Sequence, residues 1–353
     1  MSIDPDDTIE IRADERLDEE KLAKYLNDRL LGATHPPRIR QFGGGVANLT
    51  YLLDYGTNQY VLRRPPLGPV AKSAHDMARE YKVLSVLYQA FPYAPRAFHY
   101  CPDPSIIGAD FFVMERRKGV VVRKSMPPEY AGVPDAPRCL SAALVDALAE
   151  FHAVDFQAIG LGDLGEPEGF ITRQIEGWFK RWNAAKTEDV GDMETVYTWL
   201  KSNQPTTSAY SLVHNDYKLD NIMFDPSDPG KMVAIFDWDM CTLGDPLNDL
   251  GALLSYWTES TDPPTFQLMS MMPTGVGFMT RNELVERYAM KSGRSVHDVN
   301  FYHALGLFRL TVIIAQIYIR YHRGQTQDQR FASLGKMIPP MAKAALEVAE
   351  KKT

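Results

Sequence analysis

The hydrophobic pattern of the chain changes its period near residue 116, and no other feature limits the possible folds as much. Residues 38–64, RIRQFGGGVANLTYLLDYGTNQYVLRR, read as three strands separated by two turns, and residues 96–100 and 111–115 read as two more. A helical rhythm occurs in this part only at residues 74–89. Helical patterns then dominate the rest of the chain, at residues 141–153, 171–185, 193–200, 246–258, 282–290, 299–321 and 331–350. Short strands are predicted among them at residues 211–213, 222–224 and 231–236.

This change of pattern and the length of the chain together predict two lobes. A chain of 353 residues is longer than the size at which a single hydrophobic core usually stops growing. We expect an N-terminal extension at residues 1–36, a small antiparallel β lobe with one helix at residues 37–115, and a larger, mainly helical lobe at residues 116–353. The fold class is therefore α+β and bilobal. The most apolar run, residues 305–319, is shorter than a membrane-spanning helix and is expected to be a buried core helix.

Composition and charge argue against several classes of function. The 45% hydrophobic and 24% charged residues are typical of a globular protein, and no secretory signal pattern opens the sequence. The three cysteines lack metal-ligand spacing, so a cytoplasmic location is expected. A net charge of −7 disfavours nucleic acid as a partner, because phosphate neutralisation needs clustered Lys and Arg. Residues 251–353 nevertheless carry 12 bases and 8 acids, so the C-terminal part is basic.

A polar loop between two predicted strands holds the strongest candidates for catalysis. Residues 212–225, LVHNDYKLDNIMFD, contain His214, Asp216 and Asn221, and Asp237 follows the next predicted strand. Phosphoryl transfer from ATP needs an oriented hydroxyl and a magnesium ion on the phosphates, and the spacing from aspartate to asparagine is that of the protein-kinase catalytic loop. Asp216 can accept a hydrogen bond from the hydroxyl, while Asn221 and Asp237 supply hard oxygen ligands to Mg2+. We expect His214 to support the loop and not to carry a proton.

This loop and the following segment, AIFDWDMCTLGDPLNDLG, resemble the aminoglycoside phosphotransferase family, the small-molecule branch of the protein-kinase-like fold. The resemblance covers about residues 38–325 and is strongest at residues 211–257. Within the family the chain is most similar to kinases, stand-alone or fused to a dehydrogenase, that phosphorylate hydroxyacyl-CoA esters. The resemblance implies ATP and Mg2+ as cofactors, with Asp216 as the catalytic base. It also implies that the GDPxxD segment, which ends at Asp249, mainly holds the catalytic loop.

The first candidate nucleotide contacts lie in a glycine-rich turn. Gly43, Gly44 and Gly45, followed by Asn48, come between two predicted strands. Glycine lets backbone N–H groups approach phosphate oxygens because no Cβ obstructs them. We therefore expect this turn to contact the phosphates of ATP.

Further nucleotide contacts are implied by the resemblance. Arg63 takes the position of the lysine on the third strand of protein kinases, and an arginine can contact phosphate through two N–H groups. Glu80 on the following helix is expected to pair with Arg63. The segment Met114, Glu115 and Arg116 resembles the hinge between the lobes, where backbone groups would bind the adenine edge.

The acceptor is expected to be a small molecule. No A-P-E element follows Asp237, and Asn215 stands where regulated protein kinases carry an arginine. Aminoglycosides are polycations, whereas the C-terminal part is basic and contains Arg309, Arg320, Arg323 and Arg330. A hydroxyacyl-CoA, which carries several phosphates, fits this charge better, and functional coupling to an acyl-CoA dehydrogenase is implied by the resemblance. The open alternative is that these arginines pair with acids of the protein.

Other functions remain as alternatives at this stage. The acceptor could be an aminoglycoside, choline or a sugar, and Arg63 leaves open a nucleotide-binding pseudokinase. A metallohydrolase built on His214, Asp216 and Asp237 would leave the asparagine and the glycine turn without a role. In each case we expect a small-molecule ligand and neither a nucleic acid nor a membrane as partner.

Overall fold

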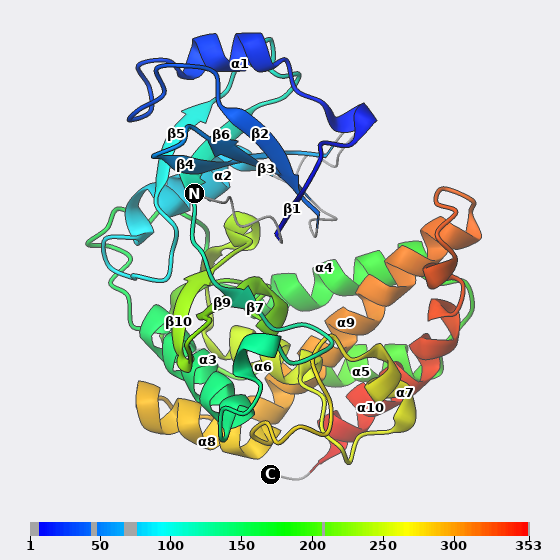
Figure 1. The fold of residues 1–353 in the computed structure, drawn as a ribbon. Coiled ribbons are helices and arrows are strands. Elements are labelled where there is room, and N and C mark those ends of the chain that lie inside the picture. Colours follow the sequence, from blue (N-terminus) through cyan, green and yellow to red (C-terminus); the bar gives the residue numbers. More distant parts are fainter. Residues whose placement is uncertain (1–6, 44–47, 67–75, 207–208, 352–353) are drawn as a thin grey trace. The chain divides into compact units, whose positions relative to one another are not determined.

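The computed structural model describes residues 7–43, 48–66, 76–206 and 209–351 (Figure 1). The chain forms two compact units. Residues 1–118 and 234–241 make up the first, which we call the sheet unit, and residues 119–233 and 242–353 make up the second, the helical unit.

The sheet unit is built on a six-stranded antiparallel sheet with the order β1-β2-β3-β4-β6-β5. Its strands are β1 (Thr8–Ile9), β2 (Arg38–Phe42), β3 (Leu49–Asp54), β4 (Gln59–Arg64), β5 (Ala97–Cys101) and β6 (Phe111–Glu115). The five strands predicted from the sequence are confirmed. The turn between β3 and β4 needs Gly56 because its φ is 86°, and its N–H donates to Asp54 Oδ1 at 2.9 Å.

Two helices accompany this sheet. The predicted helix is α2 (Met77–Leu87), whose first turn is capped by Asp76 Oδ1 accepting from the Arg79 N–H at 2.9 Å. The sequence pattern did not predict α1 (Glu19–Leu26). This helix buries Leu22 and Leu26 in a core cluster shared with β3, β4 and β6. Residues before the first long strand therefore contribute to the core of the sheet unit.

The helical unit contains eight α-helices within the described residues (Figure 1). They are α3 (Ala136–His152), α4 (Phe170–Ala185), α5 (Gly191–Ser202), α6 (Leu247–Tyr256), α7 (Pro264–Met269), α8 (Arg281–Ser292), α9 (Val299–His322) and α10 (Ile338–Glu350). The short strands are β7 (Val120–Val121), β8 (Ser211–Val213), β9 (Ile222–Asp225), β10 (Asp228–Ile235) and β11 (Thr242–Gly244). They form the ladders β10-β9-β7 and β11-β8, with the end of β10 entering the sheet unit.

Helix α9 is the centre of this unit and packs against α4, α5, α6 and α10 (Figure 1). By length and composition it is the one helix in the described ranges that could span a membrane, and 67% of its most apolar window is buried inside the protein. The prediction of a buried core helix is thus confirmed. Two glycines let α6 and α9 approach closely, since a Cβ on Gly251 would lie 2.2 Å from the Tyr302 carbonyl oxygen and one on Gly306 would lie 2.5 Å from the Gly251 oxygen.

One predicted helix is wrong in its N-terminal part. Residues 331–350 were expected to be helical throughout, but two 3-10 turns, Gln329–Phe331 and Leu334–Met337, precede α10. The α-helix begins only at Ile338 because Pro339 and Pro340 have no N–H group. Proline is tolerated in the first turn of a helix but not further along it.

Candidate functional site

The catalytic loop of the helical unit runs from the end of β8 to the start of β9, and it brings Asp216 and Asn221 together. Asn221 Nδ2 donates to the Asp216 backbone oxygen at 2.9 Å and to Asp216 Oδ2 at 3.0 Å. The Asp216 N–H donates to His214 Nδ1 at 3.2 Å, so this histidine supports the loop as predicted. Because the amide nitrogen of Asn221 is used for Asp216, its oxygen is the atom left to accept a cation.

Asp249 on α6 fixes the start of this loop, as the resemblance implied. Its Oδ2 accepts from the His214 N–H at 2.6 Å and its Oδ1 from the Asn215 N–H at 2.8 Å. Asn215 has a φ of 64°, in the left-handed region that asparagine tolerates better than most residues. Its side-chain oxygen accepts from Asn248 Nδ2 at 3.0 Å. A fully buried carboxylate thus holds the backbone that precedes Asp216.

Sequence reasoning missed Lys218, which lies two residues after Asp216. Its Nζ is 2.8 Å from Asp216 Oδ2 and 5.2 Å from the centre of the Tyr256 ring. Burial disfavours the charge on Lys218, but the carboxylates of Asp216 and Asp220 outweigh it and raise the pKa of this amine. Lys218 therefore stays a cation beside the candidate base. A lysine at this place in HNDYKLDN was the available signal.

In the sheet unit, Arg63 on β4 holds two carboxylates. Its Nε lies 3.1 Å from Glu80 Oε2, which confirms the predicted ion pair, and its Nη2 donates to Asp237 Oδ1. Glu80 Oε1 also accepts from the Trp238 N–H at 3.3 Å. Burial raises the pKa of Glu80 to about 8; Arg63 opposes this rise, and the charges of Asp237 and Asp239 add to it. One arginine therefore faces three carboxylates, an excess of negative charge.

The segment that carries Asp237 is attached firmly to the sheet unit. The Ile235 N–H donates to the Tyr93 oxygen at 2.8 Å, and the fully buried Trp238 donates from Nε1 to the Ile235 oxygen at 2.7 Å. Arg79 Nε donates to the Cys241 oxygen at 3.0 Å. Asp237 itself has a φ of 70°, so its backbone is held in the left-handed region by these contacts.

The predicted nucleotide contacts near the turn and the hinge are only partly described. Gly44 and Gly45 lie outside the described residues, while Gly43 follows β2 and Asn48 is buried before β3. A Cβ on Gly43 would make only ordinary contacts with the Ile9 side chain, so the described backbone there does not require glycine.

At the hinge, several groups already have partners in the protein. The Glu115 N–H donates to the Arg96 oxygen at 2.8 Å, so this donor is already used within the sheet unit. Arg116 donates to Gln59 Oε1 at 2.8 Å and to Asp7 Oδ2 at 3.0 Å. Its guanidinium thus joins the N-terminal segment to β4. Met114 is buried in β6 opposite Val61, and the role of this segment in binding adenine stays a prediction.

Two side chains, one in each unit, are of the kind that binds magnesium together with phosphates, and the magnesium site stays a prediction. No group of three His, Cys, Asp or Glu side chains suited to a metal occurs among the described residues. Mg2+ in kinases is usually held by one or two protein oxygens together with substrate phosphates. The Asp237 carboxylate, with 28% of its side chain exposed, and the Asn221 amide oxygen are of this kind. They come from different units, Asp237 from the sheet unit and Asn221 from the helical unit.

The C-terminal arginines have mixed surroundings. Arg309 is buried with its guanidinium 5.1 Å from the Trp178 ring, and Arg330 pairs with Asp328 at 2.6 Å. Arg320 and Arg323 are exposed at the end of α9. Local pairing therefore accounts for Arg330, and the exposed pair is the part of this set that could meet an external anion.

Comparison with known proteins assigns this chain to a family. The model of the phosphotransferase enzyme family, APH, matches residues 38–268. The chain belongs to this family and is a small-molecule kinase with the α+β, protein-kinase-like fold. A putative aminoglycoside phosphotransferase from Ralstonia eutropha superposes with a TM-score of 0.81 at 32% identity, over 96% of this chain and 100% of that one. A thermostable mutant of aminoglycoside phosphotransferase APH(4)-Ia, in complex with AMP-PNP and hygromycin B, has a TM-score of 0.60 at 14% identity, over 94% of this chain and 100% of that one, and is similar in fold alone.

Curated relatives are longer proteins. The chain is 32% identical to acyl-CoA dehydrogenase family member 11 of Rattus norvegicus, over 98% of this chain and 45% of that protein. It is also 32% identical to family member 10 of Mus musculus, over 97% of this chain and 32% of that protein. Probable acyl-CoA dehydrogenase IBR3 of Arabidopsis thaliana is 30% identical, over 95% of this chain and 43% of that protein. The chain thus spans less than half the length of these relatives.

Proposed function

We propose that this small-molecule kinase uses ATP and Mg2+ to phosphorylate the hydroxyl group of a hydroxyacyl-CoA. The observation that carries the kinase part is the geometry of the catalytic loop, in which Lys218 and Asn221 both contact Asp216 Oδ2 at 2.8 and 3.0 Å. Among the residues that the structure describes, no donor lies on Asp216 Oδ1, and the side chain is 15% exposed. That oxygen is the one that can accept a hydrogen bond from the acceptor hydroxyl.

The transfer is a simple exchange of bonds. The acceptor oxygen forms a new bond to the γ-phosphorus, the bond from that phosphorus to the bridging oxygen of ADP breaks, and the hydroxyl proton passes to Asp216. Lys218 next to this carboxylate offsets negative charge that builds up during the transfer. Mg2+, when bound through Asp237 and Asn221, would neutralise the phosphate oxygens.

The choice of acceptor rests on separate support. Several curated relatives are named as acyl-CoA dehydrogenases, and nearly the whole of this chain aligns with one segment of each of them. A hydroxyacyl-CoA is an anion, which suits the exposed Arg320 and Arg323 better than a polycation does. We propose a functional coupling to an acyl-CoA dehydrogenase on the same ground. A cytoplasmic location is part of the proposal, in keeping with three cysteines that form no disulfide.

The test is a product screen. The protein is incubated with ATP and Mg2+ and with hydroxyacyl-CoAs that differ in hydroxyl position, and with aminoglycosides, choline and sugars, and phosphorylated products are detected by mass spectrometry. We expect product from a hydroxyacyl-CoA and none from Asp216→Asn. Product from aminoglycosides alone would overturn the acceptor. Thermal stabilisation by ATP without product from any acceptor would support the pseudokinase alternative.

A further inference from the structure

A series of buried hydrogen bonds runs from the catalytic loop to α8, entirely within the helical unit. Asp249 Oδ2, which accepts from the His214 N–H, also lies 3.3 Å from Nε2 of His152, the last residue of α3. His152 Nδ1 in turn lies 2.8 Å from the hydroxyl oxygen of Tyr288 on α8. The side chains of Asp249, His152 and Tyr288 are all buried, so their polar atoms need partners within the protein.

The direction of each hydrogen bond follows from the protonation of the groups. Burial lowers the pKa of His152, so its imidazole is neutral and carries a single N–H. A carboxylate can only accept, so this proton is on Nε2, which faces Asp249, and Nδ1 is left as an acceptor that needs a donor. Burial raises the pKa of the Tyr288 hydroxyl, which therefore keeps its proton and donates it to Nδ1. Tyr288 thus stabilises the one tautomer in which His152 donates to Asp249.

Tyr288 is itself held in place because α8 is joined to α3, which packs beside it (Figure 1). Arg287, its neighbour on α8, donates to Asp146 on α3 from Nε at 2.6 Å and from Nη2 at 2.8 Å. Just beyond the helix, Arg294 Nη2 donates to the His152 backbone oxygen at 2.9 Å. The side chain and the backbone of His152 are therefore both contacted from α8 and the turn that follows it.

The other end of the series is the backbone that leads into the candidate base. Asp249 Oδ2 accepts from the His214 N–H at 2.6 Å and from His152 Nε2, while Oδ1 accepts from the Asn215 N–H at 2.8 Å. With donors on both oxygens, the carboxylate cannot rotate without losing a hydrogen bond. Asp216 directly follows Asn215, so the position of the base depends on how this carboxylate is held.

We propose that Tyr288 is a positioning residue for the catalytic base. Its hydroxyl fixes His152 in the tautomer that donates to Asp249, and Asp249 in turn holds the backbone that precedes the base. Tyr288 lies beyond residues 38–268, the segment that the family model matches, so the family assignment by itself gives this tyrosine no role. The proposal rests on the proposed function because it takes Asp216 as the base, whereas the hydrogen bonds do not depend on that role.

Nitrogen NMR tests the tautomer directly and needs neither ATP nor an acceptor. The full chain is prepared with isotope-labelled histidine, and the ring nitrogens of His152 are identified by the loss of their signals in His152→Gln. We expect the wild-type protein to carry the proton on Nε2. In Tyr288→Phe, the Nδ1 signal should move toward that of an imidazole nitrogen without a hydrogen-bond donor. A proton on Nδ1 in the wild-type protein, or an unchanged Nδ1 signal in Tyr288→Phe, would overturn the proposal.

The kinetic test is kcat of Tyr288→Phe with ATP, Mg2+ and a hydroxyacyl-CoA. Phenylalanine keeps the ring and removes only the hydroxyl, so the loop is held less firmly and kcat should fall roughly tenfold. The Kd for ATP and KM for the acceptor should stay within about twofold of the wild-type values. Because Tyr288 acts through Asp249, adding Tyr288→Phe to Asp249→Asn should lower kcat by less than about twofold further. A full tenfold loss in that background would show that Tyr288 does not act through Asp249.

Tyr130→Phe is the matched control. Tyr130 is buried in the helical unit and donates its hydroxyl to the Asp225 backbone oxygen at 2.7 Å, so this variant also loses one buried hydrogen bond. Both variants should lose similar stability in urea unfolding, but only Tyr288→Phe should lower kcat, and equal kcat values in the two would refute the positioning role. Failure of the proposed function looks different. Wild-type kcat in Asp216→Asn refutes the base, and no product from any hydroxyacyl-CoA refutes the acceptor, while the nitrogen signals still decide whether Tyr288 fixes His152.

Discussion

Asp249 is the residue whose replacement most directly tests how the catalytic loop is held. Its carboxylate is fully buried and accepts two backbone N–H groups, at 2.6 and 2.8 Å, and a third contact from His152 Nε2 at 3.3 Å. His152 Nδ1 lies 2.8 Å from the Tyr288 hydroxyl, and burial lowers the pKa of this histidine. A neutral His152 that donates from Nε2 and accepts at Nδ1 satisfies both contacts.

Two replacements of Asp249 separate stability from positioning. Asp249→Ala leaves two buried N–H groups without an acceptor, at about 1–3 kcal/mol each, so the free energy of unfolding should fall by roughly 2–6 kcal/mol. Asp249→Asn keeps the shape and one acceptor oxygen, but its NH2 group faces one of the N–H donors, and about half of that loss is expected. Because Asp216 follows the held backbone directly, kcat should fall on the order of a hundredfold even in the folded Asn variant.

The assay combines urea unfolding with kcat and with the Kd for ATP. The predicted ATP contacts lie in the sheet unit, so the Kd for ATP should stay within about twofold of the wild-type value while kcat falls. Asp298→Asn, an exposed carboxylate at the start of α9, is the matched control and should change neither quantity. Wild-type kcat in Asp249→Asn would refute the idea that this carboxylate positions the base.

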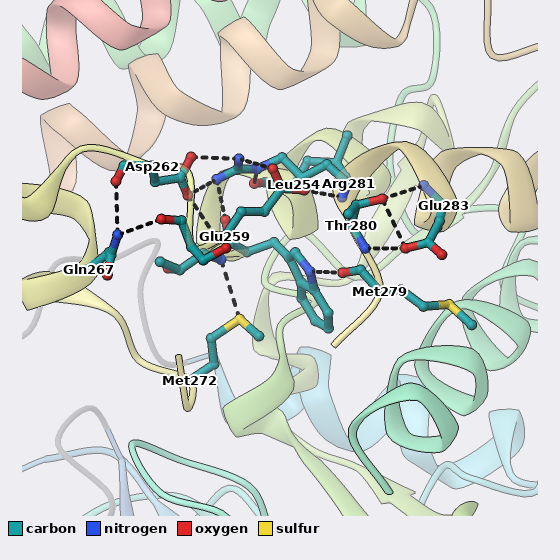
Figure 2. Close-up of polar contacts among 12 residues, drawn as sticks. Leu254, Glu259, Asp262, Gln267, Met272, Met279, Thr280, Arg281 and Glu283 are labelled. Atoms are coloured by element: carbon teal, nitrogen blue, oxygen red, sulfur yellow. Dashed lines mark hydrogen bonds and ion pairs between the residues drawn. The ribbon is translucent and has the colours of Figure 1, made fainter. Parts of the chain in front are cut away.

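Three further perturbations follow from buried charges. Arg63→Ala leaves Glu80 buried without its partner and should cost about 3–5 kcal/mol in urea unfolding, and adding Glu80→Gln should restore part of this loss. The same Arg63→Ala variant should also lose the thermal stabilisation by ATP, and retention of that stabilisation would contradict the assigned phosphate contact. Burial lowers the pKa of His303 to about 3, whereas the pKa of a histidine in an unfolded chain is about 6.5. Between about pH 3 and pH 6.5, the unfolded chain therefore binds a proton on this side chain and the folded chain does not. The contribution of neutral His303 to the free energy of unfolding is therefore fully present above about pH 6.5 and falls by about 1.4 kcal/mol per pH unit below it. In urea unfolding, the free energy of unfolding of His303→Leu should decrease less steeply as the pH falls. Arg281→Met removes the ion pair with Asp262 at 2.7 Å and the hydrogen bond to the Leu254 oxygen at 3.1 Å (Figure 2), so the free energy of unfolding in urea should fall by about 1–3 kcal/mol. An unchanged urea midpoint would contradict the structural role of this arginine.

Local patterns predicted much of the fold because they follow directly from periodicity and turn chemistry. The strands of residues 38–64 were predictable from alternating residues around Gly56, whose positive φ the turn requires. Helix α1 escaped prediction because its eight residues bury only Leu22 and Leu26, so its apolar face is short. The helix expected at residues 331–350 failed at Pro339 and Pro340, where a steric rule outweighs the apolar rhythm.

The candidate site was predictable where one motif carries it and not where distant segments meet. Asp216 and Asn221 stand five residues apart, so the spacing itself indicates that they share a loop. Asp249 was expected to hold that loop, but its contact with His152, 97 residues earlier, depends on how α3 packs near α6. Lys218 lies inside the motif, but its contact with Asp216 was not predicted, because most lysines are exposed and a lysine near acidic residues is usually a surface charge.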